Sequence, residues 1–197
     1  MKRVSITVLV LLIAGLILST PIKAEDLDPV AVMKAFGAKG EEIFSAREIA
    51  GYGENYGRMD SNHDGFLTTD EYIANSGHFR ANPAGAEGFM RISDNDRDGG
   101  LSCAEYVMNR IITDEAKEIY TRIDPATDWT AVPAFRWRMK RAAFVGSDYF
   151  ADEKMAAQIF TSMDVDGDGV LRLPEYLKAY GHWARAGLPK EILDGNK

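Results

Sequence analysis

Oxygen-bearing side chains recur at fixed intervals in three twelve-residue segments of this chain, at residues 60–71, 94–105 and 164–175. Each segment has side-chain oxygens at positions 1, 3, 5 and 12 and a glycine at position 6. A hard divalent cation takes about six to eight oxygen ligands at loose geometry. Glycine permits a sharp turn at position 6, and the position-12 glutamate is long enough to bind an ion through both oxygens. The spacing therefore predicts three cages for a hard cation such as Ca²⁺.

The candidate metal ligands occupy positions 1, 3, 5, 7, 9 and 12, where position 7 contributes its backbone carbonyl. In the first loop they are Asp60, Asn62, Asp64, Phe66, Thr68 and Glu71. In the second loop they are Asp94, Asp96, Asp98, Gly100, Ser102 and Glu105. In the third loop they are Asp164, Asp166, Asp168, Val170, Arg172 and Glu175.

The three cages differ in charge, so we do not expect equal affinities. The first loop offers one carboxylate fewer than the others, because Asn62 stands at position 3. The third loop has Arg172 at position 9, which cannot coordinate a cation and brings a positive charge near the ion. The second loop has neither feature, and we expect it to bind Ca²⁺ most tightly.

These loops and their flanks resemble the EF-hand superfamily of calmodulin-type calcium-binding proteins, over residues 41–184. The resemblance implies that each loop lies between an entering and an exiting helix. Residues four and one positions before a loop share a face of the entering helix, and most of them are apolar here. These pairs are Tyr56 and Met59, Met90 and Ser93, and Phe160 and Met163. An aromatic residue also follows each position-12 glutamate, namely Tyr72, Tyr106 and Tyr176.

A fourth hand without a cage is expected at residues 124–135, between the second and third loops. Asp124 stands at position 1, but Trp129 replaces the turn glycine and Phe135 replaces the position-12 glutamate. Two carboxylates without that clamp hold Ca²⁺ poorly. We expect this interrupted loop to serve as scaffold, with Trp129 in the core and the following residues paired with residues 170–172.

The resemblance implies an all-α fold of four EF-hand helix–loop–helix units in two pairs, with short antiparallel contacts between paired loops. The expected boundaries are residues 25–113 for hands one and two and residues 114–197 for hands three and four. Residues 106–123 contain no Pro or Gly and suit either one long helix or two helices that meet near Thr113 and Asp114. We favour the bent arrangement, because Asp114 suits a helix start.

Two further short helices are expected outside the hands. Asp28 and Pro29 open one before the first hand, and Leu188 and Pro189 open another after the last hand. Both helices carry apolar residues, so either could lie in the apolar groove of a hand pair.

The first residues have the layout of a secretory signal peptide, with cleavage expected after Ala24. A positive start at residues 1–3 precedes an apolar run that is shorter than a bilayer span. We therefore expect a secreted or periplasmic protein, with no stable membrane insertion after cleavage. The single cysteine, Cys103, permits no internal disulfide.

The net charge of −7 argues against a nucleic-acid partner. The histidines, His63, His78 and His182, form no catalytic constellation, so we expect no enzyme activity. The expected function is that of an exported protein that holds about three Ca²⁺, gains stability from them and binds a protein partner in an apolar groove. Two alternatives remain open, namely a calcium sensor that opens its groove for a target and a binder of another hard cation such as a lanthanide.

Overall fold

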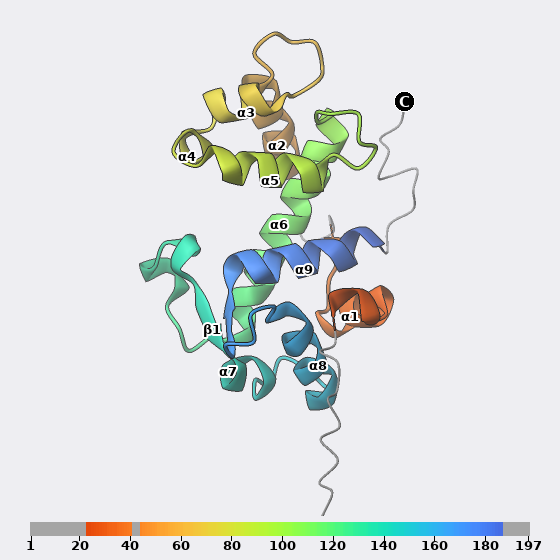
Figure 1. Cartoon of the computed structure of the whole chain (residues 1–197), viewed down its shortest axis with the longest axis vertical. Coiled ribbons are helices and arrows are strands. Elements are labelled where there is room, and N and C mark those ends of the chain that lie inside the picture. The colour runs from red at the N-terminus through yellow and green to blue at the C-terminus, as the bar shows by residue number, and fades with distance from the viewer. Residues whose placement is uncertain (1–22, 41–43, 187–197) are drawn as a thin grey trace, which may run out of the picture.

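The computed structural model describes residues 23–40 and 44–186, and it is mainly helical with one two-stranded sheet (Figure 1). The elements in chain order are η1 (Ala24–Asp26), α1 (Pro29–Ala35), α2 (Ala46–Met59), α3 (Thr69–Asn75), α4 (Gly77–Arg80), α5 (Pro83–Ser93), α6 (Cys103–Ile123), η3 (Trp129–Ala131), η4 (Ala134–Arg136), β1 (Arg138–Lys140), α7 (Arg141–Val145), α8 (Glu153–Met163), β2 (Val170–Arg172) and α9 (Leu173–Ala186). The expected signal segment, apart from Lys23 and Ala24, and the expected helix at Leu188 lie outside these residues.

Residues of the loops themselves begin the helices that follow them. Thr68 caps α3, and its hydroxyl accepts from the backbone N–H of Glu71, whose carboxylate bonds back to the N–H of Thr68. Ser102 and Glu105 form the same reciprocal pair at the start of α6. Such a pair satisfies backbone groups that a helix end leaves unpaired. Positions 9 and 12, which are predicted ligand positions, therefore also determine where α3 and α6 begin.

The first and second loops lie side by side through a short antiparallel contact at position 8. Leu67 and Leu101 exchange both backbone hydrogen bonds, with N···O distances of 2.9 and 3.0 Å. The hydroxyl of Tyr56, on the entering helix α2, donates to the carbonyl of Leu101 at 3.1 Å. Both leucines are fully buried in an apolar cluster with Tyr72 and Tyr106. We call these two loops and their helices α2, α3, α5 and α6 the first loop pair.

The second loop pair, formed by α6–α9 and the strands, repeats this contact. Met139 in β1 lies opposite Leu171 in β2, and the hydroxyl of Tyr120 donates to the carbonyl of Leu171 at 3.0 Å. Tyr120 stands four residues before Asp124, as Tyr56 stands four before Asp60. The strand that pairs with residues 170–172 is therefore residues 138–140, not residues 130–132 as expected.

An insertion explains this wrong register. The chain takes fifteen steps from Asp124 to Met139, against seven from Asp60 to Leu67. The longer loop contains η3 and η4, and it brings Trp129 and Trp137 onto Tyr120. The ring centroids of Trp129 and Tyr120 lie 5.1 Å apart, and those of Trp137 and Tyr120 lie 5.6 Å apart. The expected burial of Trp129 is confirmed, and aromatic packing accommodates the longer loop.

Helix α6 is continuous over Cys103–Ile123, so the expected bend near Thr113 and Asp114 is wrong. Asp114 does not start a new helix, because its carboxylate pairs along the helix with Arg110 at 2.8 Å and with Lys117 at 3.3 Å. Figure 1 shows α6 running from the first loop pair into the second, where α9 packs across it. The boundary expected at residues 113 and 114 falls inside this shared helix.

The short helix α1 is present where Asp28 and Pro29 predicted it, and it packs on the second loop pair. Val32 and Phe36 of this helix region are fully buried. The ring of Phe36 contacts four aromatic rings, namely those of Phe150, Tyr176, Tyr180 and Trp183. The indole N–H of Trp183 donates to the carbonyl of Ala24 at 2.7 Å. The chain before α2 thus fills an apolar surface of the second loop pair.

A buried carboxylate anchors the segment that follows α1. Glu115 on α6 is 3% exposed and accepts hydrogen bonds from the backbone N–H groups of Lys39 and Gly40, at 2.6 and 2.8 Å. Its other oxygen accepts from the hydroxyl of Tyr180 at 3.0 Å. One side chain of α6 therefore joins the N-terminal segment to α9.

The first prediction concerns this anchor. Glu115→Ala leaves two part-buried backbone N–H groups and the buried hydroxyl of Tyr180 without their acceptor, so we expect the free energy of unfolding to fall by about 3 kcal/mol. Glu118→Ala is the matched control, because Glu118 lies on the same helix with its side chain 52% exposed, and we expect a change below about 0.5 kcal/mol there. Urea unfolding followed by circular dichroism measures both. Equal effects of the two substitutions would contradict the anchoring role.

Candidate metal centres

The three loops share one backbone conformation, including two left-handed positions each. Position 6 has a positive φ in Gly65, Gly99 and Gly169, at 82°, 101° and 76°. Position 4 has one as well, in His63, Arg97 and Gly167, at 56°, 61° and 70°. Non-glycine residues with positive φ are uncommon, because Cβ crowds the backbone there. His63 and Arg97 adopt this conformation at the same position, so the loop geometry overrides the local preference.

Backbone amides hold the ligand carboxylates in place inside each turn. The amide of the position-6 glycine donates to the position-1 aspartate, at 3.0 Å in the first loop, 3.1 Å in the second and 3.0 Å in the third. The position-5 amide donates to the position-3 side chain in each loop. The position-7 amide donates to the position-5 aspartate. These bonds fix the orientation of the predicted ligand side chains at positions 1, 3 and 5.

The position-12 glutamate closes the first and second loops from the helix side. Glu71 accepts from Thr68 through one oxygen and from the backbone N–H of Ser61 through the other, at 3.0 and 3.2 Å. Glu105 spans the second loop in the same way and is 3% exposed. Hydrogen bonds from the backbone and hydroxyl of Thr68 lower the pKa of Glu71 to about 2. This glutamate therefore stays ionised at neutral pH, as a cation ligand must.

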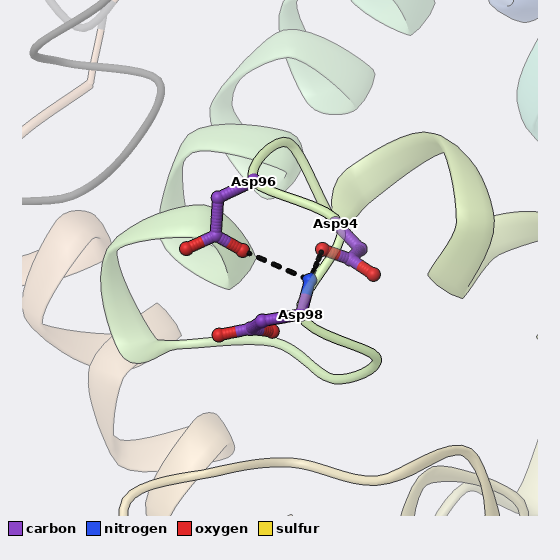
Figure 2. A group of neighbouring side chains, drawn as sticks. All are labelled: Asp94, Asp96 and Asp98. Atoms are coloured by element: carbon purple, nitrogen blue, oxygen red, sulfur yellow. Dashed lines mark hydrogen bonds between the residues drawn. The ribbon is translucent and has the colours of Figure 1, made fainter.

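The structure brings the predicted aspartates of the second and third loops together. Oxygens of Asp94, Asp96 and Asp98 lie within 4.8 Å of one another, as do those of the corresponding aspartates of the third loop. Figure 2 shows the second group, in which the amide of Asp98 donates to Asp94 and Asp96 at 3.2 and 3.3 Å. The first loop has Asn62 in place of the middle carboxylate.

Unpartnered carboxylate oxygens test whether a cation fits these loops. Asp60 is 4% exposed, and no described donor lies within hydrogen-bond distance of its buried Oδ1. Oδ1 of Asp164 is also buried without a described donor. A buried ionised oxygen without a partner costs several kcal/mol, on the order of 3. Both atoms belong to position 1 of a loop, where a bound cation would satisfy them, so the residues present fit a hard cation.

The interrupted loop uses its carboxylates for turns. Asp124 accepts from the hydroxyl of Thr127 at 2.7 Å, and Asp128 accepts from the backbone and hydroxyl of Thr130. With Met139 as position 8, the position of the clamping glutamate falls on Ala143. The described residues of this loop therefore bring no set of carboxylates together.

Arg172 lies over the carboxylates of the third loop rather than pointing away from them. Its guanidinium pairs with Asp166 at 2.9 Å and also with Asp168. It approaches Glu175 at 3.6 Å. The hydrogen bond from Arg172 lowers the pKa of Asp168 and raises the pKa of the guanidinium. The sequence places this cation at position 9, but only the structure shows that it contacts three of the predicted ligands.

Comparison of this chain with protein-family models finds no match, and comparison with curated proteins finds none either. Any function must therefore be argued from the site itself. Among the described residues, no helix combines the length and the apolar character needed to cross a membrane.

The second prediction concerns the contact between the first two loops. A Cβ on Gly100 would overlap the ring of Phe66, the residue at position 7 of the facing loop. We expect Gly100→Ala to displace that ring and to lower the free energy of unfolding by about 1–3 kcal/mol. The loss should be smaller when Phe66 is already alanine, which a double-mutant cycle by urea unfolding measures.

Gly88→Ala is the control for this experiment, because Gly88 lies in α5 and a Cβ there meets nothing within 4 Å. We expect that variant to be as stable as the native chain or slightly more stable. A loss for Gly100→Ala that is independent of Phe66 would show that the two loops do not touch at this position.

Proposed function

We propose that this chain is an exported calcium-binding protein that holds about three Ca²⁺ in EF-hand loops and gains its full stability from them. The observation that carries the proposal is the position-1 aspartate. The Asp60 side chain is ionisable and almost completely buried. Its Oδ2 accepts from the amide of Gly65, whereas its Oδ1 has no described partner. Burying such a group is unfavourable unless a cation compensates it.

Four EF-hand units in two pairs account for the repetition of contacts. The tyrosine–carbonyl bond and the position-8 contact occur in both loop pairs. The aromatic residue five positions after position 8 also recurs, as Tyr72, Tyr106, Phe144 and Tyr176, and all four are buried. Hand three keeps this packing while its loop carries the insertion. We therefore assign it the role of partner to hand four.

Each proposed site uses its residues in the same way. Aspartate or asparagine side chains at positions 1, 3 and 5 and the backbone carbonyl at position 7 contribute oxygens, and the position-12 glutamate contributes two. The backbone amides of positions 5, 6 and 7 orient the side-chain oxygens before an ion arrives. When bound, Ca²⁺ supplies the positive charge that the converging carboxylates lack. The second loop offers four carboxylates with no competing cation among its ligand positions, so we propose it as the tightest site.

The position of α1 favours a structural role for calcium over a sensor role. A sensor must expose an apolar groove to its target when the ion binds. In the second loop pair, Val32 and Phe36 of the chain's own N-terminal region already cover that surface and are fully buried. A protein partner would therefore have to displace α1 or bind the first loop pair.

The third prediction tests the number and order of the sites. Native mass spectrometry should detect about three Ca²⁺, and Glu105→Gln should remove the tightest site seen by calorimetry, because the clamp loses a charged oxygen. Glu54→Gln, on the exposed face of α2, is the control and should bind like the native chain. A count of four ions or of one ion contradicts the proposal.

The fourth prediction concerns stability. At free calcium about 100-fold above Kd, each filled site adds about 2.7 kcal/mol, provided that the unfolded chain does not bind. One such site corresponds to a rise in Tm of about 5–10 °C in a domain of this size. Thermal scans with calcium and with a chelator measure this rise. The triple variant Glu71→Gln, Glu105→Gln, Glu175→Gln should lose it, whereas a rise that persists in this variant would place calcium elsewhere.

A further inference from the structure

Position 9 of the third loop departs from the other two loops in both chemistry and contacts. Thr68 and Ser102 donate their hydroxyls to the glutamate of their own loop, at 2.8 and 2.9 Å. Arg172 has no hydroxyl, and only its backbone N–H makes the equivalent bond, to Glu175 at 3.0 Å. Its side chain instead extends over the turn, 35% exposed, and pairs with Asp166 and Asp168.

We propose that Arg172 is a tethered cation that occupies the third loop and competes with Ca²⁺ for its carboxylates. The third site then fills only at higher calcium than the first two. This inference rests on the proposed function, because it concerns the regulation of one of the proposed sites. It also means that the second loop pair needs calcium less than the first loop pair does.

The geometry of the guanidinium supports this competition. Arginine presents several N–H donors in a rigid fork that matches carboxylates, and the fork here reaches the ligands of positions 3 and 5 while it approaches that of position 12. A group on the same chain acts at high effective concentration, so an ion in solution must displace it. The guanidinium does not satisfy every ligand, because Oδ1 of Asp164 keeps no described partner. The loop therefore retains an unfilled ligand that still favours a metal ion at sufficient concentration.

Strand pairing adds a second reason for the third site to resist filling. Arg172 lies directly opposite Arg138 in the two-stranded sheet. Like charges in directly opposed positions weaken strand pairing. The carboxylates of the loop neutralise Arg172 in the structure described here, and a metal ion would take those carboxylates from it. Filling the site would therefore separate Arg172, which faces Arg138, from the carboxylates that pair with it.

One backbone amide in each loop can report on that loop alone. Gly65, Gly99 and Gly169 each donate to the position-1 aspartate of their own loop. A calcium titration followed by two-dimensional ¹H–¹⁵N NMR gives a separate midpoint for each glycine. In the native chain we expect the midpoint of Gly169 at calcium about tenfold or more above those of the other two. In Arg172→Thr, which copies the residue of the first loop, we expect the midpoint of Gly169 to fall by about the same factor.

A transplanted arginine provides the reciprocal experiment. The second loop has acids at the same positions as the three acids that Arg172 contacts, namely Asp96, Asp98 and Glu105. Ser102→Arg should therefore raise the midpoint of Gly99 beyond that of Ser102→Ala, which removes the same helix cap without adding charge. This comparison keeps the proposal testable if Arg172→Thr does not fold.

The outcomes separate this inference from the proposed function. If Gly65 and Gly99 respond to calcium while Gly169 has the same midpoint with and without Arg172, the tethered cation is refuted and the calcium-binding function stands. The same holds if Ser102→Arg binds like Ser102→Ala. If none of the three glycines responds in any variant, both proposals fail.

Discussion

The mutual repulsion of carboxylates within a short loop is the constraint on which this structure depends. In the second and third loops, three aspartates hold oxygens within 4.8 Å of one another. Like charges at that separation repel one another, although solvent and salt screen part of the repulsion at a protein surface. Amides of positions 5, 6 and 7 and the caps at the start of the exiting helices offset part of this repulsion. They do so by using backbone groups that a turn and a helix end leave unpaired. Under the proposed function a cation compensates the remaining oxygens, and only in the third loop does the chain place one of its own, Arg172, among the acids.

The pairing of loops transmits this local constraint to the core. Position 8 is the point at which a loop contacts its partner, and the residues there, Leu67, Leu101, Met139 and Leu171, are almost completely buried. A tyrosine of the entering helix bonds to the position-8 carbonyl of the second loop in each pair, so the turn, the facing turn and one helix are fixed together. The positions of the ligand side chains in one turn are therefore coupled to the packing of two loops. Helix α6, which belongs to both loop pairs, joins the two pairs.

The sequence predicted the features that depend on short spacing, and it missed those that depend on packing between distant segments. The convergence of the loop acids, the positive φ of the turn glycines and the helix start at Pro29 follow from residues within about one loop length of one another. The pairing of β2 with residues 138–140 did not follow, because the insertion becomes visible only when Trp129 and Trp137 lie against Tyr120. The alternation around Met139 between two exposed basic residues was the signal for β1. Asp114 suited a helix start, but the ion pairs with Arg110 and Lys117 use it inside α6 instead.

The two loop pairs solve the problem of missing partners differently. In the second pair, segments of the same chain fill both places: α1 covers the apolar surface, and Arg172 pairs with two of the loop acids. In the first pair, the smaller apolar cluster lies beneath two loops whose position-9 residues, Thr68 and Ser102, carry no charge and cannot pair with the loop acids as Arg172 does. A segment whose folded form leaves a charge uncompensated is less stable until a ligand binds that form. We therefore infer that calcium acts mainly on the first loop pair, and that α6 carries its effect into a second pair that is already assembled.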